Sequence, residues 1–440
     1  MAAGIIDSGH PARADVDEAA ALRATIAAHP EADLPRLVYA DWLEDGGDDT
    51  QAAFLRTQVQ LAHEPAWSPL AVRCRHHTPE VLTGEPWRHT LPAVSPRIAA
   101  WHPETPFRRG APDWLVVRDL ASFLDDAGRL FDLAPITTLS LPTSSLDYWQ
   151  EFARRPWLRQ VRALHFYGVS TPIEPLRVLA NAVNASGIEE LTLERTSGPA
   201  FPVVLNDLFQ SDLGKRLKRL DLRAGGENDG EWIEALETLP QRHPLESLEL
   251  RAMELRHYGV RQLTASRVFK NLRRFLYSND RINTSSLRVL LRRENHRSYE
   301  DLNFTRVLAN REEAEVIAGS PISGHIKRLD LSNNPLNRLE GWAKSKWFQG
   351  LNSLSLRDCM LDGQALEEIA GMCCWPTLAE LDLRGNVLRN AAFESLLTHD
   401  PPAGLTALRL TRKPSTPYGE KLESKLQEHF RGAVVFSDAS

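Results

Sequence analysis

The sequence predicts an α/β solenoid, in which short strands and helices alternate along most of the chain. One observation is an apolar pattern that occurs eleven times, with leucine or a similar residue at its first, fourth and sixth positions. The second observation is its regular spacing, since successive copies begin 25 to 29 residues apart. The third is a helical pattern after the copies. Evenly spaced units of roughly 20 to 50 residues are typical of stacked repeats, so the fold is a repeat array.

The copies of the pattern give the positions of the expected strands. They begin at Ile136, Val161, Ile188, Leu217, Leu245, Leu272, Tyr299, Ile326, Leu351, Leu378 and Leu405. The fourth and sixth positions have period two, which places their side chains on one side of a strand. Between copies the period changes: in Gly363–Ala370, the residues Leu366, Ile369 and Ala370 share one helix face.

The strongest copies carry a further feature eight residues after their first position. These pairs are Asn334 with Leu336, Cys359 with Leu361, and Asn386 with Leu388. The array resembles leucine-rich repeats of the ribonuclease-inhibitor-like kind, which implies that the Asn or Cys satisfies buried backbone groups where each strand turns. Asp280 is a plausible substitute, whereas Val169, Thr196, Gly225 and Val307 depart from the pattern. Because helices need more width than strands, the resemblance and the spacing predict a horseshoe with a concave parallel sheet and convex helices.

A helical module precedes the repeats. Asp33 is positioned to cap a helix that Gly46 and Gly47 end, and a second helix is expected from about Thr50 to Ala62. The sequence RLVYADWLE at Arg36–Glu44 and the segment AFLRTQ at Ala53–Gln58 resemble the bacterial repeat-companion domain. This resemblance implies an architecture and no reaction.

We therefore expect four parts. These are a helical repeat-companion domain at 15–63, an irregular connecting segment at 64–110, the solenoid at 111–411 and a C-terminal cap at 412–440. Within them, Trp114–Val117 is expected as a capping strand and Leu120–Leu133 as its helix. Lys421–Phe430 and Ala433–Phe436 are expected as the closing helix and strand.

Composition excludes several function classes. Lys and Arg total 52 against 58 Asp and Glu, for a net charge of -6, which lacks the basic surface of a nucleic-acid-binding protein. The start of the chain has no secretory pattern, and no segment offers ~18 uninterrupted apolar residues for a membrane helix. We expect a cytoplasmic protein without membrane contact, with its four cysteines reduced.

Two groups of residues could carry chemistry. Tyr39, Asp41 and Glu44 share a predicted helix, but no nucleophile or phosphate loop accompanies them, so we expect packing, caps and ion pairs there. The run Cys74–His77, with His89 and His102 nearby, lacks the paired ligands of a structural zinc site and is interpreted as surface histidines on a loop. We expect no catalytic residue, no cofactor and no metal.

The remaining hypothesis is a non-enzymatic scaffold or recognition module that binds another protein. If the leucines point inward, the residues beside them face the concave surface. That surface is expected to include Arg219, Asp221, Arg223, Glu249, Arg251, Arg328, Asp330, Arg357, Asp382 and Arg384. One alternative is a regulatory or sensor subunit that recognises nucleic acid or an enzyme partner. Another is that these charges only neutralise their neighbours. The partner's identity and the oligomeric state stay open.

Overall fold

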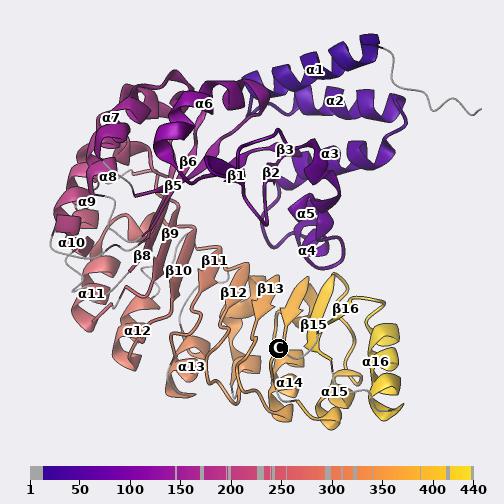
Figure 1. Ribbon diagram of the computed structural model, residues 1–440. Helices are drawn as coiled ribbons and strands as arrows, with labels where there is room; N and C mark the ends of the chain where they lie inside the picture. The colour runs from indigo at the N-terminus through magenta and orange to yellow at the C-terminus, as the bar shows by residue number, and fades with distance from the viewer. Residues whose placement is uncertain are drawn as a thin grey trace, which may run out of the picture. The chain divides into compact units, whose positions relative to one another are not determined.

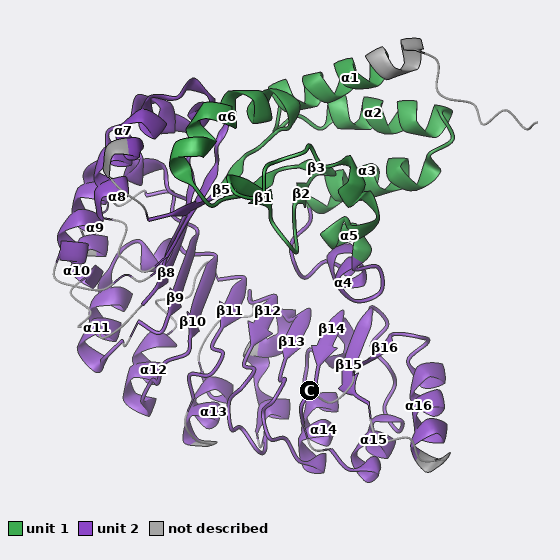
Figure 2. Cartoon of the chain, in the orientation of Figure 1, with its two compact units in different colours: residues 1–63, 80–139 green, residues 64–79, 140–440 purple. Residues whose placement is uncertain are grey.

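The computed structural model divides the chain into two compact units (Figure 2). Unit 1 consists of residues 1–63 and 80–139, and unit 2 of residues 64–79 and 140–440. The structure describes residues 13–143, 146–168, 173–194, 196, 200–224, 232–237, 239, 243–253, 255–292, 299–308, 311–320, 325–339, 341–386, 388–412 and 417–437. In these residues, no helix is both long and apolar enough to cross a membrane.

Unit 1 combines helices with two small antiparallel strand pairs. Its elements are α1 (Arg13–Ala28), α2 (Leu34–Asp45), α3 (Asp49–Leu61), α5 (Glu80–Thr83), η1 (Glu85–Thr90), β1 (Ala99–Trp101), β2 (Phe107–Arg108), β3 (Ala111–Pro112), β4 (Trp114–Val117) and α6 (Leu120–Leu133). Strand β1 pairs with β4, and β2 pairs with β3. The strand and helix expected at Trp114–Val117 and Leu120–Leu133 are confirmed.

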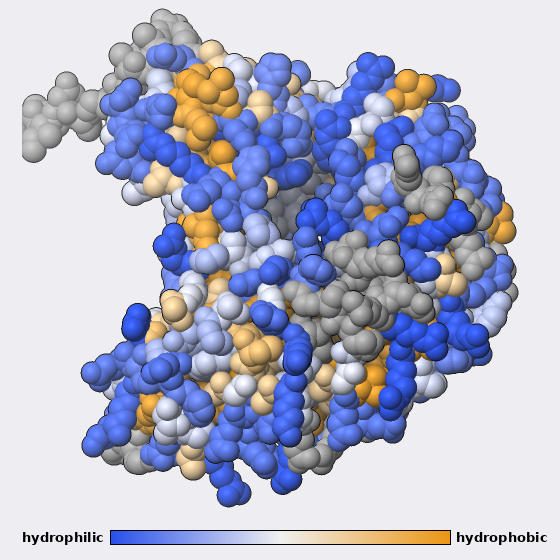
Figure 3. Space-filling model, turned by 180° about the vertical axis from the view of Figure 1, so that it is seen from behind, coloured by the Kyte–Doolittle hydropathy of each residue, from blue (hydrophilic) through white to orange (hydrophobic). Residues whose placement is uncertain are grey.

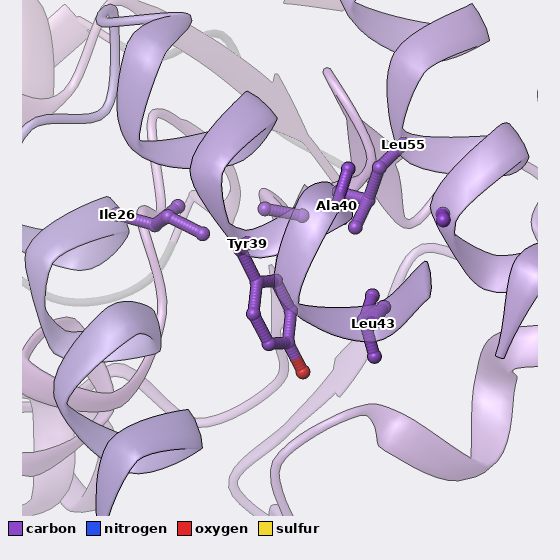
Figure 4. Close-up of a cluster of buried hydrophobic side chains, with 7 residues drawn as sticks. Ile26, Tyr39, Ala40, Leu43 and Leu55 are labelled. Carbon is purple, nitrogen blue, oxygen red and sulfur yellow. The ribbon is translucent and has the colours of Figure 1, made fainter. Parts of the chain in front are cut away.

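Helices α2 and α3 pack around one apolar cluster. Ile26, Tyr39, Ala40, Leu43, Ala52, Leu55 and Ala111 are buried together (Figure 4). Gly47 follows α2 with a φ of +84°, a conformation that glycine adopts without strain, so the helix ends there as expected. The side chain of Asp48 then accepts a hydrogen bond from the Gln51 amide at 3.0 Å and caps α3.

The expected cap at Asp33 is wrong. Its backbone is already helical, with φ −81° and ψ −35°, and its side chain makes no capping hydrogen bond. Instead one carboxylate oxygen lies 3.1 Å from Arg109 Nη1 and the other lies 2.6 Å from His63 Nε2. A capping residue needs an extended backbone to aim its oxygen at the first helical amides, and Asp33 does not have one.

Unit 2 is built on a parallel sheet. Its strands follow chain order as β5 (Thr138–Pro142), β6 (Ala163–Tyr167), β7 (Glu190–Glu194), β8 (Arg219–Arg223), β9 (Ser247–Arg251), β10 (Arg274–Ser278), β11 (Asp301–Asn303), β12 (Arg328–Asp330), β13 (Ser353–Ser355), β14 (Glu380–Asp382), β15 (Ala407–Thr411) and β16 (Val434–Ser437). From β6 onward each strand pairs in parallel with the next. All eleven strands expected from the repeat are present, and so is the closing strand.

Helices line the convex side of this sheet (Figure 1). They are α7 (Leu146–Arg154), α8 (Ile173–Ala180), α9 (Ala200–Gln210), α10 (Trp232–Glu237), α11 (His257–Ala265), α12 (Thr284–Leu290), α13 (Arg311–Ala318), α14 (Gly363–Ala370), α15 (Asn390–Leu396) and α16 (Pro417–His429). Leucines of the repeat are buried between the two layers; Leu220, Leu250, Leu331 and Leu383 are at most 1% exposed. The fold is therefore a leucine-rich-repeat solenoid.

One repeat departs from the expected strand and helix. Between β12 and β13, the described residues form two 3-10 helices, η7 (Trp342–Lys344) and η8 (Lys346–Gly350), and no α-helix. Pro335 follows the strand and Gly341 adopts a φ of +83°, so neither supports a continuous α-helix in this connection.

The asparagines of the turns act as the resemblance implied. Asn334 is fully buried; its Oδ1 accepts from the amides of Val307 and Leu308 at 2.8 Å, and its Nδ2 donates to the carbonyls of Phe304 and Leu331 at 2.7 Å. Asn386, two repeats further along the chain, makes four contacts of the same kind. It accepts from the amides of Cys359 and Leu361 and donates to the carbonyls of Leu356 and Leu383. Asp280 accepts from the Leu255 amide at 3.1 Å, as expected of a substitute. Val169 and Gly225 lie outside the described residues.

Candidate functional site

The concave face of unit 2 carries columns of side chains that strand pairing holds in register. The first column contains Glu190, Arg219, Ser247, Arg274, Asp301, Arg328, Ser353, Glu380 and Ala407. The second contains Thr192, Asp221, Glu249, Leu276, Asn303, Asp330, Ser355, Asp382 and Arg409. A third begins with Glu194, Arg223 and Arg251. Parallel pairing therefore brings residues about one repeat apart into direct contact.

Carboxylates and guanidinium groups lie at different depths on this face. The side chain of Asp301 is 6% exposed and that of Asp221 12%, whereas Arg219 is 61% exposed. Long arginine stems lie over the sheet while their charged ends stay near water. The side chains of Asp221, Glu249 and Asp301 are therefore less exposed than those of the arginines that pair with them.

Ion pairs connect these columns across β7 to β12. The paired atoms are Arg223 with Glu194 at 3.2 Å and with Asp221 at 2.8 Å, Arg251 with Asp221 at 3.5 Å and with Glu249 at 2.5 Å, Arg274 with Glu249 at 3.1 Å and with Asp301 at 3.4 Å, and Arg328 with Asp301 at 3.5 Å. The network includes Arg274 and Asp301, which our sequence-based set omitted. The position rule that selected Arg219 and Arg328 selects them too, so the sequence did contain the signal.

Burial and neighbouring charges both shift the pKa values of Asp301 and Arg328. Burial raises the pKa of Asp301, and the neighbouring charges of Arg328 and Arg274 only partly offset it. Burial by itself would lower the pKa of Arg328, but the charges of Asp301 and Asp330 outweigh it and raise the pKa. Arg328 therefore keeps its charge, and pairing with Arg328 and Arg274 partly compensates the burial of the Asp301 carboxylate.

The C-terminal repeats form a second group. Arg384 and Arg409 both approach Asp382, at 2.7 Å and 2.9 Å, and Asp330 accepts from the Ser332 hydroxyl at 2.6 Å. Arg357 is different, because its side chain is 44% exposed and its ion pair is with its sequence neighbour Asp358 at 2.8 Å. Of the ten predicted residues, Arg219 and Arg357 are thus the most accessible. The other eight make the ion pairs or hydrogen bonds described above.

A contact that the sequence did not indicate occupies β14. Arg75 and His76, in helix α4 (Pro69–His76) of unit 2, both contact the Glu380 carboxylate, at 3.0 Å and 2.5 Å. Our interpretation of Cys74–His77 as a surface loop is therefore wrong. Cys74 is buried, and the His76 side chain is only 3% exposed. Loop composition suggested exposure, whereas these residues form a helix that packs on the sheet.

The pKa values at this contact show a charged acid beside a neutral histidine. Burial opposes ionisation of Glu380, but the hydrogen bond from His76 and the charge of Arg75 outweigh it and hold the pKa of Glu380 at about 2. Burial also lowers the pKa of His76, although Glu380 acts in the opposite direction. His76 Nε2 therefore donates a hydrogen to the carboxylate as a neutral imidazole, while Arg75 supplies the charge.

Tyr39, Asp41 and Glu44 of α2 make packing contacts and ion pairs. Tyr39 stacks on Trp42 with ring centroids 5.8 Å apart. Arg56 contacts Asp41 at 2.7 Å and Glu44 at 2.6 Å, which joins α2 to α3. Packing and ion pairing were expected of this group. Within the described ranges, no group of three or more His, Cys, Asp or Glu side chains could hold a metal ion.

Apolar residues on the face drawn in Figure 3 occur in small separate groups among hydrophilic ones. A large exposed apolar patch is the usual mark of a hydrophobic interface.

Comparisons with known proteins assign no family to this chain. No protein-family model matches the sequence, and the curated proteins contain no significant match. Solved structures similar to this chain include the yeast Rad7 and Elc1 complex, at 14% identity over 86% of this chain and 93% of that chain, with a TM-score of 0.41. A Bacteroides fragilis protein matches at 13% identity over 61% of this chain and 82% of that chain, with a TM-score of 0.34. The assignment as a leucine-rich-repeat solenoid rests on this chain's own strand order and repeat.

Proposed function

We propose that this protein is a non-enzymatic recognition module that binds another protein through the concave surface of its repeats. The observation that supports it is the register of the columns over β7 to β15, which holds charged side chains of both signs at fixed positions and pairs Arg219 with Glu190 and Asp301 with Arg274 and Arg328. Complementary charges of this kind set orientation and exclude wrong partners. Because arginines on this face pair with carboxylates, as Arg223 does with Asp221 and Arg384 with Asp382, these columns do not form the uniformly positive surface that suits a nucleic acid.

Arg357 is the residue best placed to test this proposal. It is accessible, and among the residues that the structure describes it forms an ion pair with its sequence neighbour Asp358, so its reversal leaves the network around Asp301 intact. Arginine is also enriched among residues that dominate binding energy. We expect Arg357→Glu to weaken capture of the native partner about tenfold or more, measured by quantitative affinity capture and then with the purified partner.

The control is Arg261→Glu on the convex helix α11, where the arginine is exposed and the charge change is identical. Both variants should melt like the wild type, because neither side chain is buried. Loss of capture in the α11 variant, with capture retained in Arg357→Glu, would place the binding surface on the opposite side. Reversal of Arg384 is less informative, since it would set a second carboxylate beside Asp382, which is 6% exposed, whereas Asp358 beside Arg357 is 36% exposed.

A further inference from the structure

Helix α4 is a short basic helix that its own chain seats on the concave sheet. Ser68 caps it by accepting a hydrogen bond from the Ala71 amide at 3.1 Å, and Pro69 occupies its first turn. Its last turn carries Arg73, Arg75 and His76. Positive charge at a helix C-terminus is favourable, so the sequence supports the helix and concentrates its basic groups at one end.

The sheet offers this helix a specific place. In the first column, Glu380 lies between Ser353 and Ala407, two small residues, while the same column holds arginines at β8, β10 and β12. Ser353 also donates its hydroxyl hydrogen to Glu380 at 2.7 Å. In the first column, small side chains therefore flank one oriented carboxylate.

Three consecutive residues make the contact. Arg75 and His76 divide the two Glu380 oxygens between them, and His77 Nε2 lies 2.7 Å from the Thr406 carbonyl oxygen. The helix has eight residues, and its Val72 and Cys74 are buried as well. Helices of this length are marginal on their own, so α4 depends on these contacts to keep its place.

The Glu380 side chain is 8% exposed with Arg75 and His76 in contact, so departure of α4 would open it to water. A partner that buries this carboxylate again must supply cationic or hydrogen-bonding groups if it is to remain ionised. Asp382, on the same face two residues further, adds negative charge that Arg384 and Arg409 already balance. An incoming group must therefore supply donors and positive charge in the arrangement that Arg75 and His76 show.

We propose that the surface formed by Ser353, Glu380 and Ala407, here called the β14 surface, binds a short basic helix of the partner, and that α4 occupies it as an internal competitor. This inference rests on the proposed function, because it assumes that the partner binds the concave face. The partner's helix presents an arginine with an adjacent histidine or second basic residue. Partner binding displaces α4. The segment 64–79, which contains α4, therefore regulates access to the β14 surface.

The test uses the full chain and a labelled synthetic peptide of residues 64–79, with Cys74→Ser to prevent oxidation. An open variant combines Arg75→Ala, His76→Ala and His77→Ala, which removes the three contacts. A tethered segment competes at an effective concentration of roughly millimolar, so the peptide should bind the open variant at least about tenfold more tightly than the wild type. Fluorescence anisotropy measures both affinities, and added salt should weaken the binding.

Two controls make the result specific. Arg73→Ala changes an exposed basic residue of the same helix that makes none of the three contacts, so this protein should bind the peptide as weakly as the wild type. Adding Glu380→Gln to the open variant removes the charge at nearly constant shape and should abolish binding. Equal binding to the wild-type and open proteins, binding that survives Glu380→Gln, or no binding to the open variant at millimolar peptide each overturns the inference.

Hydrogen exchange gives a second measurement that needs no peptide. In Glu380→Gln alone, the α4 amides should exchange faster than in the wild type while those of β8 to β10 do not change; unchanged α4 exchange would contradict the proposal. These assays contain no partner. Their failure alongside a strong Arg357→Glu effect rejects only the internal competitor, whereas an ineffective Arg357→Glu rejects the proposed function.

Discussion

Individual side chains in this protein stabilise two very different kinds of polar contact. Asn334 has no exposed surface and satisfies backbone groups of two repeats, whereas Arg56 makes its ion pairs at the surface of α2 and α3. Buried polar groups cost free energy when they lose their partners, while exposed ion pairs contribute little. Residue type alone does not rank these contacts, but burial does.

Asn334→Ala should lower the free energy of unfolding by about 2 to 4 kcal/mol, because it leaves the amides of Val307 and Leu308 and two carbonyls buried without partners. Urea denaturation of the full chain measures the change. Asn206→Ala, on the surface of α9, serves as the control and should stay within about 0.5 kcal/mol of the wild type. Equal effects of the two substitutions would contradict the structural role of the turn asparagine.

At the scale of elements, apolar side chains of α1, α2 and α3 pack these three helices against one another. Tyr39, Ala40 and Leu43 on α2 meet Ile26 from α1 and Leu55 from α3 (Figure 4). Arg36 is 2% exposed, and it donates to the carbonyls of Ala32 at 2.7 Å and Pro30 at 2.8 Å. Burial, and secondarily the charge of Arg109, lower the pKa of Arg36 to about 10. It therefore remains protonated at neutral pH and fastens the turn between α1 and α2.

Replacement of Arg36 and replacement of Arg56 should lower the free energy of unfolding by very different amounts. Arg36→Ala removes buried donors from two carbonyls and should cost about 2 to 4 kcal/mol, whereas Arg56→Ala breaks surface ion pairs and should cost less than about 1 kcal/mol. Denaturation followed by far-ultraviolet circular dichroism measures both. A larger effect for Arg56 than for Arg36 would show that the surface pairs, not the turn, hold these helices together.

For the whole molecule, the position of the cut should determine how a truncated chain behaves. Strand β1 pairs with β4 and α1 packs against α6, so residues 111–139 belong with the preceding helices of unit 1. Deletion of residues 1–110 should uncover the apolar side of α6, which includes the buried residues Phe123 and Leu124. We expect a melting temperature several degrees lower, or lower solubility.

Deletion of residues 1–137 provides the comparison, because it also removes α6 and its apolar face and leaves β5 whole. The shorter chain should be more soluble than the one that begins at residue 111, even though it has fewer residues. Differential scanning calorimetry and sedimentation distinguish the two. A 1–110 deletion that melts like the full chain would show that α6 does not depend on the residues before it.

The sequence by itself determined the strands, most helices and the turn asparagines of the repeats. Those features follow from periods of two and 3.6 residues and from short fixed spacings, which act between near neighbours in the chain. The same alternation identified the face on which Asp221, Glu249 and Asp382 lie. It also included the positions of Arg274 and Asp301, although we did not name them. The domain boundaries and the ten partner-binding residues stay predictions.

Only the tertiary structure decided which distant groups meet. Arg75 and Glu380 are 305 positions apart, and no local period indicates that a short helix near the N-terminus packs on β14. Asp33 likewise carried the sequence of a helix cap, but Arg109 and His63 take its oxygens in the folded chain. Local patterns fix which face of an element is apolar, whereas the partners of a charged side chain depend on the path of the whole chain.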